Sequence, residues 1–242
     1  MRPFGEAMDL DVDFGAADRP GLVTTVLSQC AGLGDPAYWW EQPVGERTAA
    51  LLQLVTLTEQ GDALPLTARC VAQGCGESFE FELPWRALPT GASDSGPLHV
   101  RLADGRAVAM RRPTGTDLRE WRKAQLAAPP ASREHAVRLM LNSLVLTGNA
   151  RPDDEATLAD ALAAADPLVH FTVACRCAAC DAPNEVDVDL ESIALAKLVA
   201  RQRALMHDVH VLASNYGWTE SEVLAVPPAR RARYIALIED GR

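Results

Sequence analysis

The cysteines are the residues of this chain whose type and spacing point most directly to chemistry. Five of the six fall into two short clusters, Cys70 with Cys75, and Cys175 with Cys177 and Cys180. Each cluster stands between two strand-like segments, which is the arrangement of a zinc knuckle. Thiolate is a soft ligand that suits Zn²⁺, and two knuckles together make one closed tetrahedral site. The sequence therefore predicts a structural zinc site that ties distant segments together.

The second cluster offers three sulfurs for two ligand positions. Cys177 and Cys180 have the two-residue spacing that best closes a knuckle, so with Cys70 and Cys75 they are the predicted ligands. Cys175 stays open as the alternative to Cys177, because Cys175 and Cys180 repeat the spacing between Cys70 and Cys75. Two other hypotheses are reduced structural cysteines without a metal and a redox-active dithiol. The strand-turn-strand context argues against the dithiol.

Composition and charge restrict the class of protein. The chain has 242 residues, 48% of them hydrophobic, which is enough for one large or two small cores. A net charge of −10 argues against general nucleic-acid binding, which needs a basic surface. No apolar run approaches the roughly 18–20 residues of a membrane span, and the first residues contain no apolar signal core. We therefore expect a cytoplasmic protein, in whose reducing compartment clustered cysteines favour a metal over disulfides.

The pattern of apolar residues and breakers predicts a mainly helical α+β fold with a two-knuckle zinc ribbon and a β-hairpin insert. We expect four parts: a flexible N-terminal arm at 1–18, an N-terminal helical segment at 19–63, a zinc-ribbon domain at 64–190 and a C-terminal helical tail at 191–242. The ribbon domain contains an insert of a hairpin and helices at 98–166. The sixth cysteine, Cys30, is expected to be a small core residue of a helix.

No set of residues for catalysis emerges from the sequence. His207 and His210 lie three residues apart on a predicted long helix, but no third metal ligand is apparent near them. There is no phosphate-binding glycine loop and no pairing of a nucleophile with a base. We therefore predict that the protein is not an enzyme and has no small-molecule substrate.

The C-terminal residues form a more specific pattern. A helix with aliphatic and His residues ends at Tyr216-Gly217-Trp218, and Thr219 to Glu222 form a capping box that starts a short helix. A proline stop and the segment Arg230-Arg231-Ala232-Arg233-Tyr234 follow. This pattern resembles a motif of tail-assembly proteins in contractile phages and in phage-derived contractile injection systems.

Over roughly residues 20–240 the chain is similar to the T-even phage baseplate-hub assembly family and its relatives in injection-system gene clusters. The similarity includes a Val-Gly-x-Arg motif at Val44 to Arg47, two cysteine knuckles around a hairpin and helix, and a Pro-Thr-x-x-Asp-Leu turn at Pro113 to Leu118. The chain departs from the family in three ways, one of which is an unusual region before the first knuckle. Its first knuckle is Cys-x4-Cys where relatives tend to have Cys-x2-Cys, and Cys175 is an additional cysteine.

The resemblance implies a non-enzymatic assembly chaperone or minor structural component of a baseplate or hub, which acts by protein–protein docking. Its partners would be baseplate, hub or tape-measure proteins of the same apparatus, with no nucleic acid and no membrane. It would be cytoplasmic, with incorporation into a virion or injection particle as an option. The expected docking surface has apolar anchors and a charged rim. The anchors are Tyr216, Trp218, Leu224 and Tyr234, and the rim is Arg230, Arg231 and Arg233. The alternative function is that of a zinc-ribbon regulator that binds nucleic acid.

Overall fold

The computed structural model describes residues 1–32, 35–59, 61–89 and 96–240. It confirms a mixed α and β fold that is mainly helical. The chain forms two compact units. The first unit takes in residues 1–36, 51–60 and 192–242, and the second takes in residues 37–50 and 61–191. The predicted C-terminal tail therefore lies almost wholly in the first unit and the predicted ribbon domain lies in the second, whereas the predicted N-terminal helical segment at 19–63 is divided between the two.

The first unit is built from helices packed on an aliphatic core. Its helices are α1 (Ala7–Leu10), α2 (Arg19–Cys30), the second half of α4 (Val44–Thr58), most of α8 (Leu190–Tyr216), α9 (Glu220–Ala225) and α10 (Pro228–Asp240). Residues at three- and four-residue steps supply the buried faces of these helices. They include Val23, Val26, Leu27, Leu51, Leu54, Val55, Leu198 and Leu205. Cys30 is buried among them, as expected.

The N-terminal segment is folded, so the prediction of a flexible arm at residues 1–18 is wrong. Phe4 is buried, and the buried carboxylate of Asp9 accepts hydrogen bonds from Arg2 at 2.6 and 2.7 Å. The side-chain amide of Gln202 in α8 donates to the carbonyls of Asp9, Leu10 and Val12. The acidic composition suggested solvated charges, but Arg2 neutralises Asp9 and Gln202 satisfies the backbone around it.

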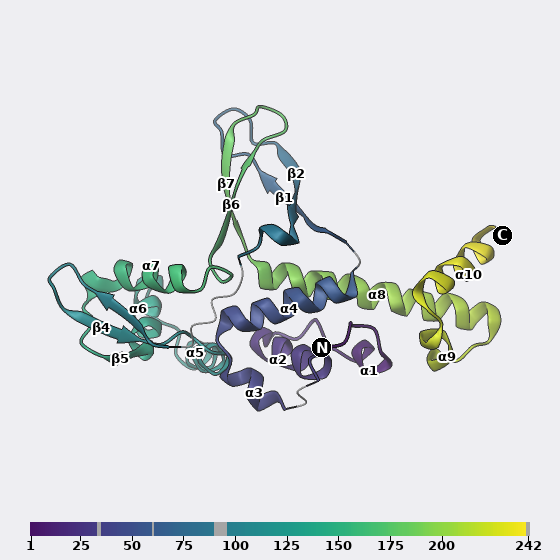
Figure 1. Cartoon of the computed structure of the whole chain (residues 1–242), viewed down its shortest axis with the longest axis horizontal. Helices are drawn as coiled ribbons and strands as arrows, with labels where there is room; N and C mark the ends of the chain where they lie inside the picture. Colours follow the sequence, from purple (N-terminus) through teal and green to yellow (C-terminus); the bar gives the residue numbers. More distant parts are fainter. Residues whose placement is uncertain (33–34, 60, 90–95, 241–242) are drawn as a thin grey trace. The chain divides into compact units, whose positions relative to one another are not determined.

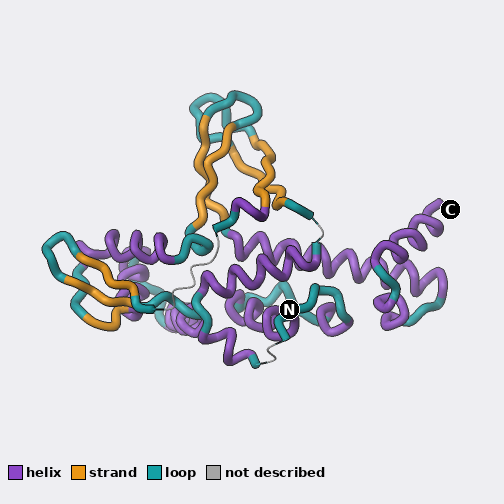
Figure 2. The backbone as a smooth tube through the Cα atoms, in the orientation of Figure 1, coloured by secondary structure: helices purple, strands orange, loops and turns teal. Residues whose placement is uncertain are grey.

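The second unit contains two antiparallel hairpins that make the expected strand-turn-strand elements (Figures 1 and 2). The strands are β1 (Ala63–Arg69) with β2 (Ser78–Pro84), and β6 (Phe171–Arg176) with β7 (Pro183–Val188). In β1, Leu64, Leu66 and Ala68 are buried while the residues between them are exposed, so one face of the hairpin packs inward. Ala68 and Phe79 of the first hairpin form a small core with Cys177 of the second.

The predicted insert also forms, with one additional strand. A three-stranded sheet of β3 (Leu98–Arg101), β4 (Ala107–Met110) and β5 (Val145–Thr147) accompanies α5 (Gly115–Ala127), α6 (Arg133–Leu144) and α7 (Glu155–Ala165). The sequence did not indicate β5, because the apolar pattern of α6 continues without interruption into it. Pairing with β4 makes Val145 to Thr147 extended. The remaining elements are α3 (Pro36–Glu41) and the 3₁₀ helices η1 (Trp85–Ala87) and η2 (Pro152–Asp154).

The Val-Gly-x-Arg motif and the Pro-Thr turn, about 70 residues apart, lie against each other in the second unit. The N–H of Val44 donates to the carbonyl of Pro113 at 2.9 Å, and the N–H of Gly115 donates to the carbonyl of Gln42 at 3.2 Å. Arg47 is fully buried beside them and donates to the carbonyl of Trp39. The two motifs therefore pack directly against each other.

Gly45 makes the closest approach in this contact. Its N–H donates to the buried Asp166 at 3.0 Å. A Cβ atom at position 45 would overlap the carboxylate of Asp166. Only glycine therefore allows the backbone of α4 to come this close to Asp166.

Candidate metal centre

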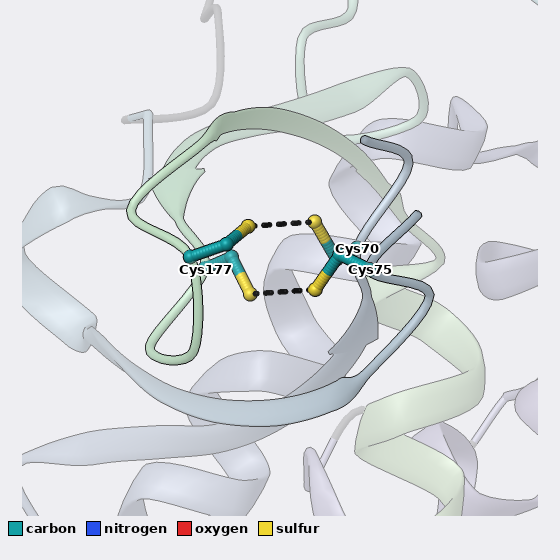
Figure 3. A group of neighbouring side chains, drawn as sticks. Cys70, Cys75 and Cys177 are labelled. Carbon is teal, nitrogen blue, oxygen red and sulfur yellow. Dashed lines mark hydrogen bonds between the residues drawn. The ribbon is translucent and has the colours of Figure 1, made fainter. Parts of the chain in front are cut away.

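Four cysteines converge where the loops of the two hairpins meet (Figure 3). The sulfurs of Cys70, Cys75, Cys177 and Cys180 all lie within 4.8 Å of one another. Cys70 Sγ is 3.7 Å from Cys180 Sγ, and Cys75 Sγ is 3.9 Å from Cys177 Sγ. A tetrahedral ion with metal–sulfur bonds of about 2.3 Å needs sulfurs about 3.8 Å apart. The four thiols could therefore hold a metal ion with little rearrangement.

The two knuckles have the same backbone design. The N–H of Cys70 donates to the carbonyl of Glu77 at 2.9 Å, and the N–H of Cys177 donates to the carbonyl of Ala182 at 3.0 Å. In both knuckles, the acceptor lies two residues after the second cysteine. Cys70 therefore corresponds to Cys177, and not to Cys175 as the repeated spacing suggested.

The arginines that precede the knuckles show the same correspondence. Arg69 Nε donates to the carbonyl of Gly76 at 2.9 Å, and Arg176 Nη1 donates to the carbonyl of Asp181 at 2.8 Å. Each arginine stands directly before the first cysteine and reaches the residue directly after the second. The two extra residues of the first loop lie between its cysteines and leave this closure unchanged.

The residue after the second cysteine turns the chain back toward the sulfur. Gly76 and Asp181 have positive φ values of 63° and 58°, a conformation that glycine adopts freely and Asp tolerates. The following N–H groups, of Glu77 and Ala182, then donate to the sulfurs of Cys75 and Cys180. These backbone N–H groups stabilise negative charge on sulfur.

The hydrogen bond between Cys70 and Cys180 shifts the pKa values of these two thiols in opposite directions. The N–H of Ala72 is the main cause that lowers the pKa of Cys70, to about 7. The N–H of Ala182 also lowers the pKa of Cys180, but hydrogen bonds with Cys75 and Cys70 and burial outweigh it and raise that pKa to about 12. An ionised Cys70 therefore favours the protonated form of Cys180, and a bound metal would have to displace that proton.

Cys175 is not part of the four-sulfur group. It lies in β6 opposite Asn184 and packs against the small core between the hairpins. Burial is the main cause that raises the pKa of its thiol. Of the two alternatives in the second cluster, the structure places Cys177 with the other three sulfurs.

Sequence reasoning missed Asn184, which lies in β7 and is 5% exposed. Its Oδ1 accepts from the N–H of Val71 at 2.9 Å. Its Nδ2 donates to the carbonyl of Ala182 at 2.8 Å and points to Cys70 Sγ at 3.8 Å. The sequence feature that could have identified Asn184 is its position in the strand, since it alternates with Val186 and Val188 on the inward face of β7.

Three of the predicted partner-binding residues, Tyr216, Trp218 and Tyr234, lie together in the C-terminal part of the first unit. Trp218 stacks on Tyr216 with ring centroids 5.1 Å apart, and Tyr234 meets the edge of Trp218 at 5.3 Å. Tyr216 is 43% exposed, Trp218 and Tyr234 are partly buried, and so is Leu224. The aromatic rings therefore contact one another and keep only part of their surface open to solvent.

The predicted arginine rim needs one correction. Arg230 and Arg233 are exposed, but Arg231 is 3% exposed, with its Nε 3.8 Å from Asp208. Arg231 faces inward because α10 turns that side of the helix toward α8. Its guanidinium is thus part of the packing of the unit and not of an exposed rim. His207 and His210 are exposed on α8 and belong to no group of three potential ligands among the described residues.

Comparison with known proteins gives no relative of this chain: no protein-family model, no curated protein and no solved structure matches it significantly. No helix in the described part of the chain is long and apolar enough to cross a membrane.

Proposed function

We propose that this chain is a zinc-stabilised, non-enzymatic assembly factor or minor component of the baseplate or hub of a contractile injection system. The observation that carries the proposal is the four-cysteine group, which would surround a tetrahedral ion on all sides. A site with four protein ligands leaves no position for a substrate or a catalytic water, so such a site stabilises structure. The specific apparatus comes from the resemblance of the C-terminal motif.

Zinc is the metal that this donor set favours. Four thiolates are soft ligands, and Zn²⁺ accepts a tetrahedral arrangement without any redox chemistry. Metal analysis of the purified chain should give about one zinc per molecule. Iron at the same stoichiometry would indicate a redox centre, and metal-free protein with an unchanged fold would refute the zinc ribbon.

Docking would use the C-terminal surface of the first unit. Tyr216 and Trp218 offer a stacked aromatic pair, and the exposed Arg230 and Arg233 lie on the helix that carries Tyr234. Aromatic and arginine side chains dominate the energetics of protein interfaces. This surface would bind baseplate, hub or tape-measure proteins of the same apparatus.

The charge of the ribbon disfavours the alternative function as a nucleic-acid regulator. Exposed carboxylates line the outward faces of both hairpins, with Glu80 and Glu82 on β2 and Glu185 and Asp187 on β7. Phosphate groups would be repelled from these faces, because nucleic-acid binding depends on the neutralisation of phosphate by basic residues.

The test is titration calorimetry of the full chain against purified baseplate, hub and tape-measure proteins encoded beside it. Tyr216→Ala should weaken binding by at least about tenfold, as expected of an interface anchor. Tyr38→Ala is the matched control, since Tyr38 has a similar exposure of 44% and lies in the other unit. Equal effects of both variants, or no binding to any of these proteins, would exclude the docking proposal. Salt-dependent binding to DNA would favour the regulator instead.

A further inference from the structure

We propose that Asn184 is the positioning residue of the metal centre, which locks the two knuckles together and stabilises the thiolate of Cys70. The inference rests on the proposed zinc site and adds a residue that no cysteine pattern reveals. Asn184 belongs to the hairpin of the second knuckle, but two of its three contacts are with the first knuckle.

The orientation of the Asn184 amide follows from its backbone partners. Val71 offers an N–H, which only the oxygen Oδ1 can accept, at 2.9 Å. Ala182 offers a carbonyl, which only the nitrogen Nδ2 can contact as a donor, at 2.8 Å. The second hydrogen of Nδ2 is thereby directed toward Cys70 Sγ, 3.8 Å away. A flipped amide would lose both backbone hydrogen bonds.

The N–H group of Val71 needs a hydrogen-bond partner from outside its own loop, because the loop of the first knuckle is long. Val71 follows Cys70 in a loop with four residues between the cysteines, and its side chain is 76% exposed. Its N–H is held by Asn184, a residue 113 positions further along the chain. Asn184 thereby holds the start of the wider loop in the position that directs Cys70 toward Cys180.

The contact with Cys70 matters for charge. Four thiolates around a divalent cation leave a net negative site, and each N–H donor to sulfur reduces the repulsion among them. The sulfurs of Cys75 and Cys180 accept backbone N–H groups within their own knuckles. Cys70 also receives an N–H from Ala72, and Asn184 adds a donor from the opposite hairpin.

The two knuckles are not equivalent at this position. By the correspondence of Cys75 with Cys180, the counterpart of Asn184 is Phe79, which packs in the small core between the hairpins. Only the second hairpin therefore carries a polar bridge. Loss of this bridge should weaken the site as a whole without removing any of its four ligands.

The experiment measures zinc affinity of the full chain by competition with a chromophoric chelator, for wild type, Asn184→Asp and Asn184→Ala. Both variants should bind zinc about 10–100-fold more weakly, in the range known for residues that support metal ligands. Asn184→Asp should bind zinc more weakly than Asn184→Ala, because its carboxylate would repel both the sulfur of Cys70 and the carbonyl oxygen of Ala182. Cobalt should still give the absorption spectrum of a four-thiolate site in each variant.

Asn142→Asp is the control, since Asn142 is exposed on α6 and the substitution adds the same charge away from the site. It should leave zinc affinity unchanged. Affinities of both Asn184 variants within about twofold of wild type would overturn the inference, and so would an equal loss in the control. Wild-type protein that binds no zinc would overturn the metal centre itself, so the two failures are distinguishable.

Hydrogen exchange of zinc-loaded wild-type protein provides a test that needs no variant. The amide of Val71 should be protected, because Asn184 holds it although the side chain of Val71 is exposed. Exchange of this amide at the rate of an unstructured peptide would overturn the inference, even if the Asn184 variants failed to fold.

Discussion

Two serine substitutions, Cys175→Ser and Cys177→Ser, test which of these two cysteines binds the proposed metal. Cys177→Ser removes a sulfur that lies 3.9 Å from Cys75 Sγ within the four-sulfur group. Cys175→Ser changes a residue of the same stretch that lies outside that group. Both substitutions replace sulfur by oxygen, and the two positions are only two residues apart. Effects that do not depend on metal binding should therefore be similar in the two variants.

The expected magnitude follows from the linkage between binding and folding. Free zinc at 100 times its Kd stabilises the folded protein by about 2.7 kcal/mol. For a unit of this size each kcal/mol moves Tm by about 2–4 °C, so zinc should raise Tm by about 5–11 °C. If Cys177→Ser binds zinc about 100-fold more weakly, the same zinc concentration adds only about 0.4 kcal/mol, or about 1–2 °C. Cys177 is buried, so a water molecule has little access to replace its sulfur.

The assay is thermal unfolding of each protein with and without added zinc, monitored by circular dichroism and by calorimetry. Wild type and Cys175→Ser should both show the full zinc-dependent rise of Tm, whereas Cys177→Ser should show almost none. A full rise in Cys177→Ser together with its loss in Cys175→Ser would refute the assignment and make Cys175 the ligand. No zinc dependence in any of the three proteins would refute the metal site.

Three further predictions address the rest of the molecule. Gly45→Ala should lower the free energy of unfolding, measured in urea, by about 0.5–2 kcal/mol, because the hydrogen bond to the Asp166 carboxylate (about 1.5–3 kcal/mol) is lost and the higher helix propensity of Ala returns about 1 kcal/mol. Gly61→Ala should be neutral, because a Cβ at position 61 meets no neighbouring atom within 4 Å. Equal effects of the two variants would contradict the close approach at Gly45. Burial raises the pKa of Asp9, but hydrogen bonds from Arg2 and two N–H groups outweigh it and hold that pKa below its ordinary value. The stability that Asp9 contributes should therefore be complete at neutral pH and lost as pH falls below about 4, and Asp9→Asn should remove this acid dependence of Tm. The zinc Kd should rise at least tenfold for each unit by which pH falls, already above pH 7, because zinc must displace protons from thiols such as Cys180, whose pKa is raised to about 12. A pH-independent Kd would contradict the thiolate site.

The parts of the site that depend on local sequence were predictable. Spacing of the cysteines and alternation in the flanking strands predicted both hairpins and favoured the four cysteines that the structure brings together, with Cys175 left open as the alternative to Cys177. The correspondence of Cys70 with Cys177 was not predictable, since it depends on where each hairpin closes rather than on the number of residues between cysteines. Asn184 was missed for a related reason, because its partner Val71 is distant in sequence.

Charged residues were the least predictable part of the chain. Asp9 and Arg231 both look like solvated surface groups in sequence, yet both are buried. Each has its counter-charge in another segment, Asp9 with Arg2 and Arg231 with Asp208. The sequence shows which residues are charged and therefore need either a counter-charge or water. Only the tertiary fold decides whether a given residue is paired or solvated.

The arrangement of the four sulfurs has a consequence for biosynthesis. Cys70 and Cys180 are 110 residues apart in the chain. At about 5–20 residues per second, a ribosome needs roughly 5–20 s to make the second pair of cysteines after the first. During that interval the nascent chain carries only two of the four clustered cysteines, while the intervening hairpin and helices are already emerging. The insert should therefore fold before the four cysteines come together, and the availability of the proposed metal should limit only the last stage of maturation.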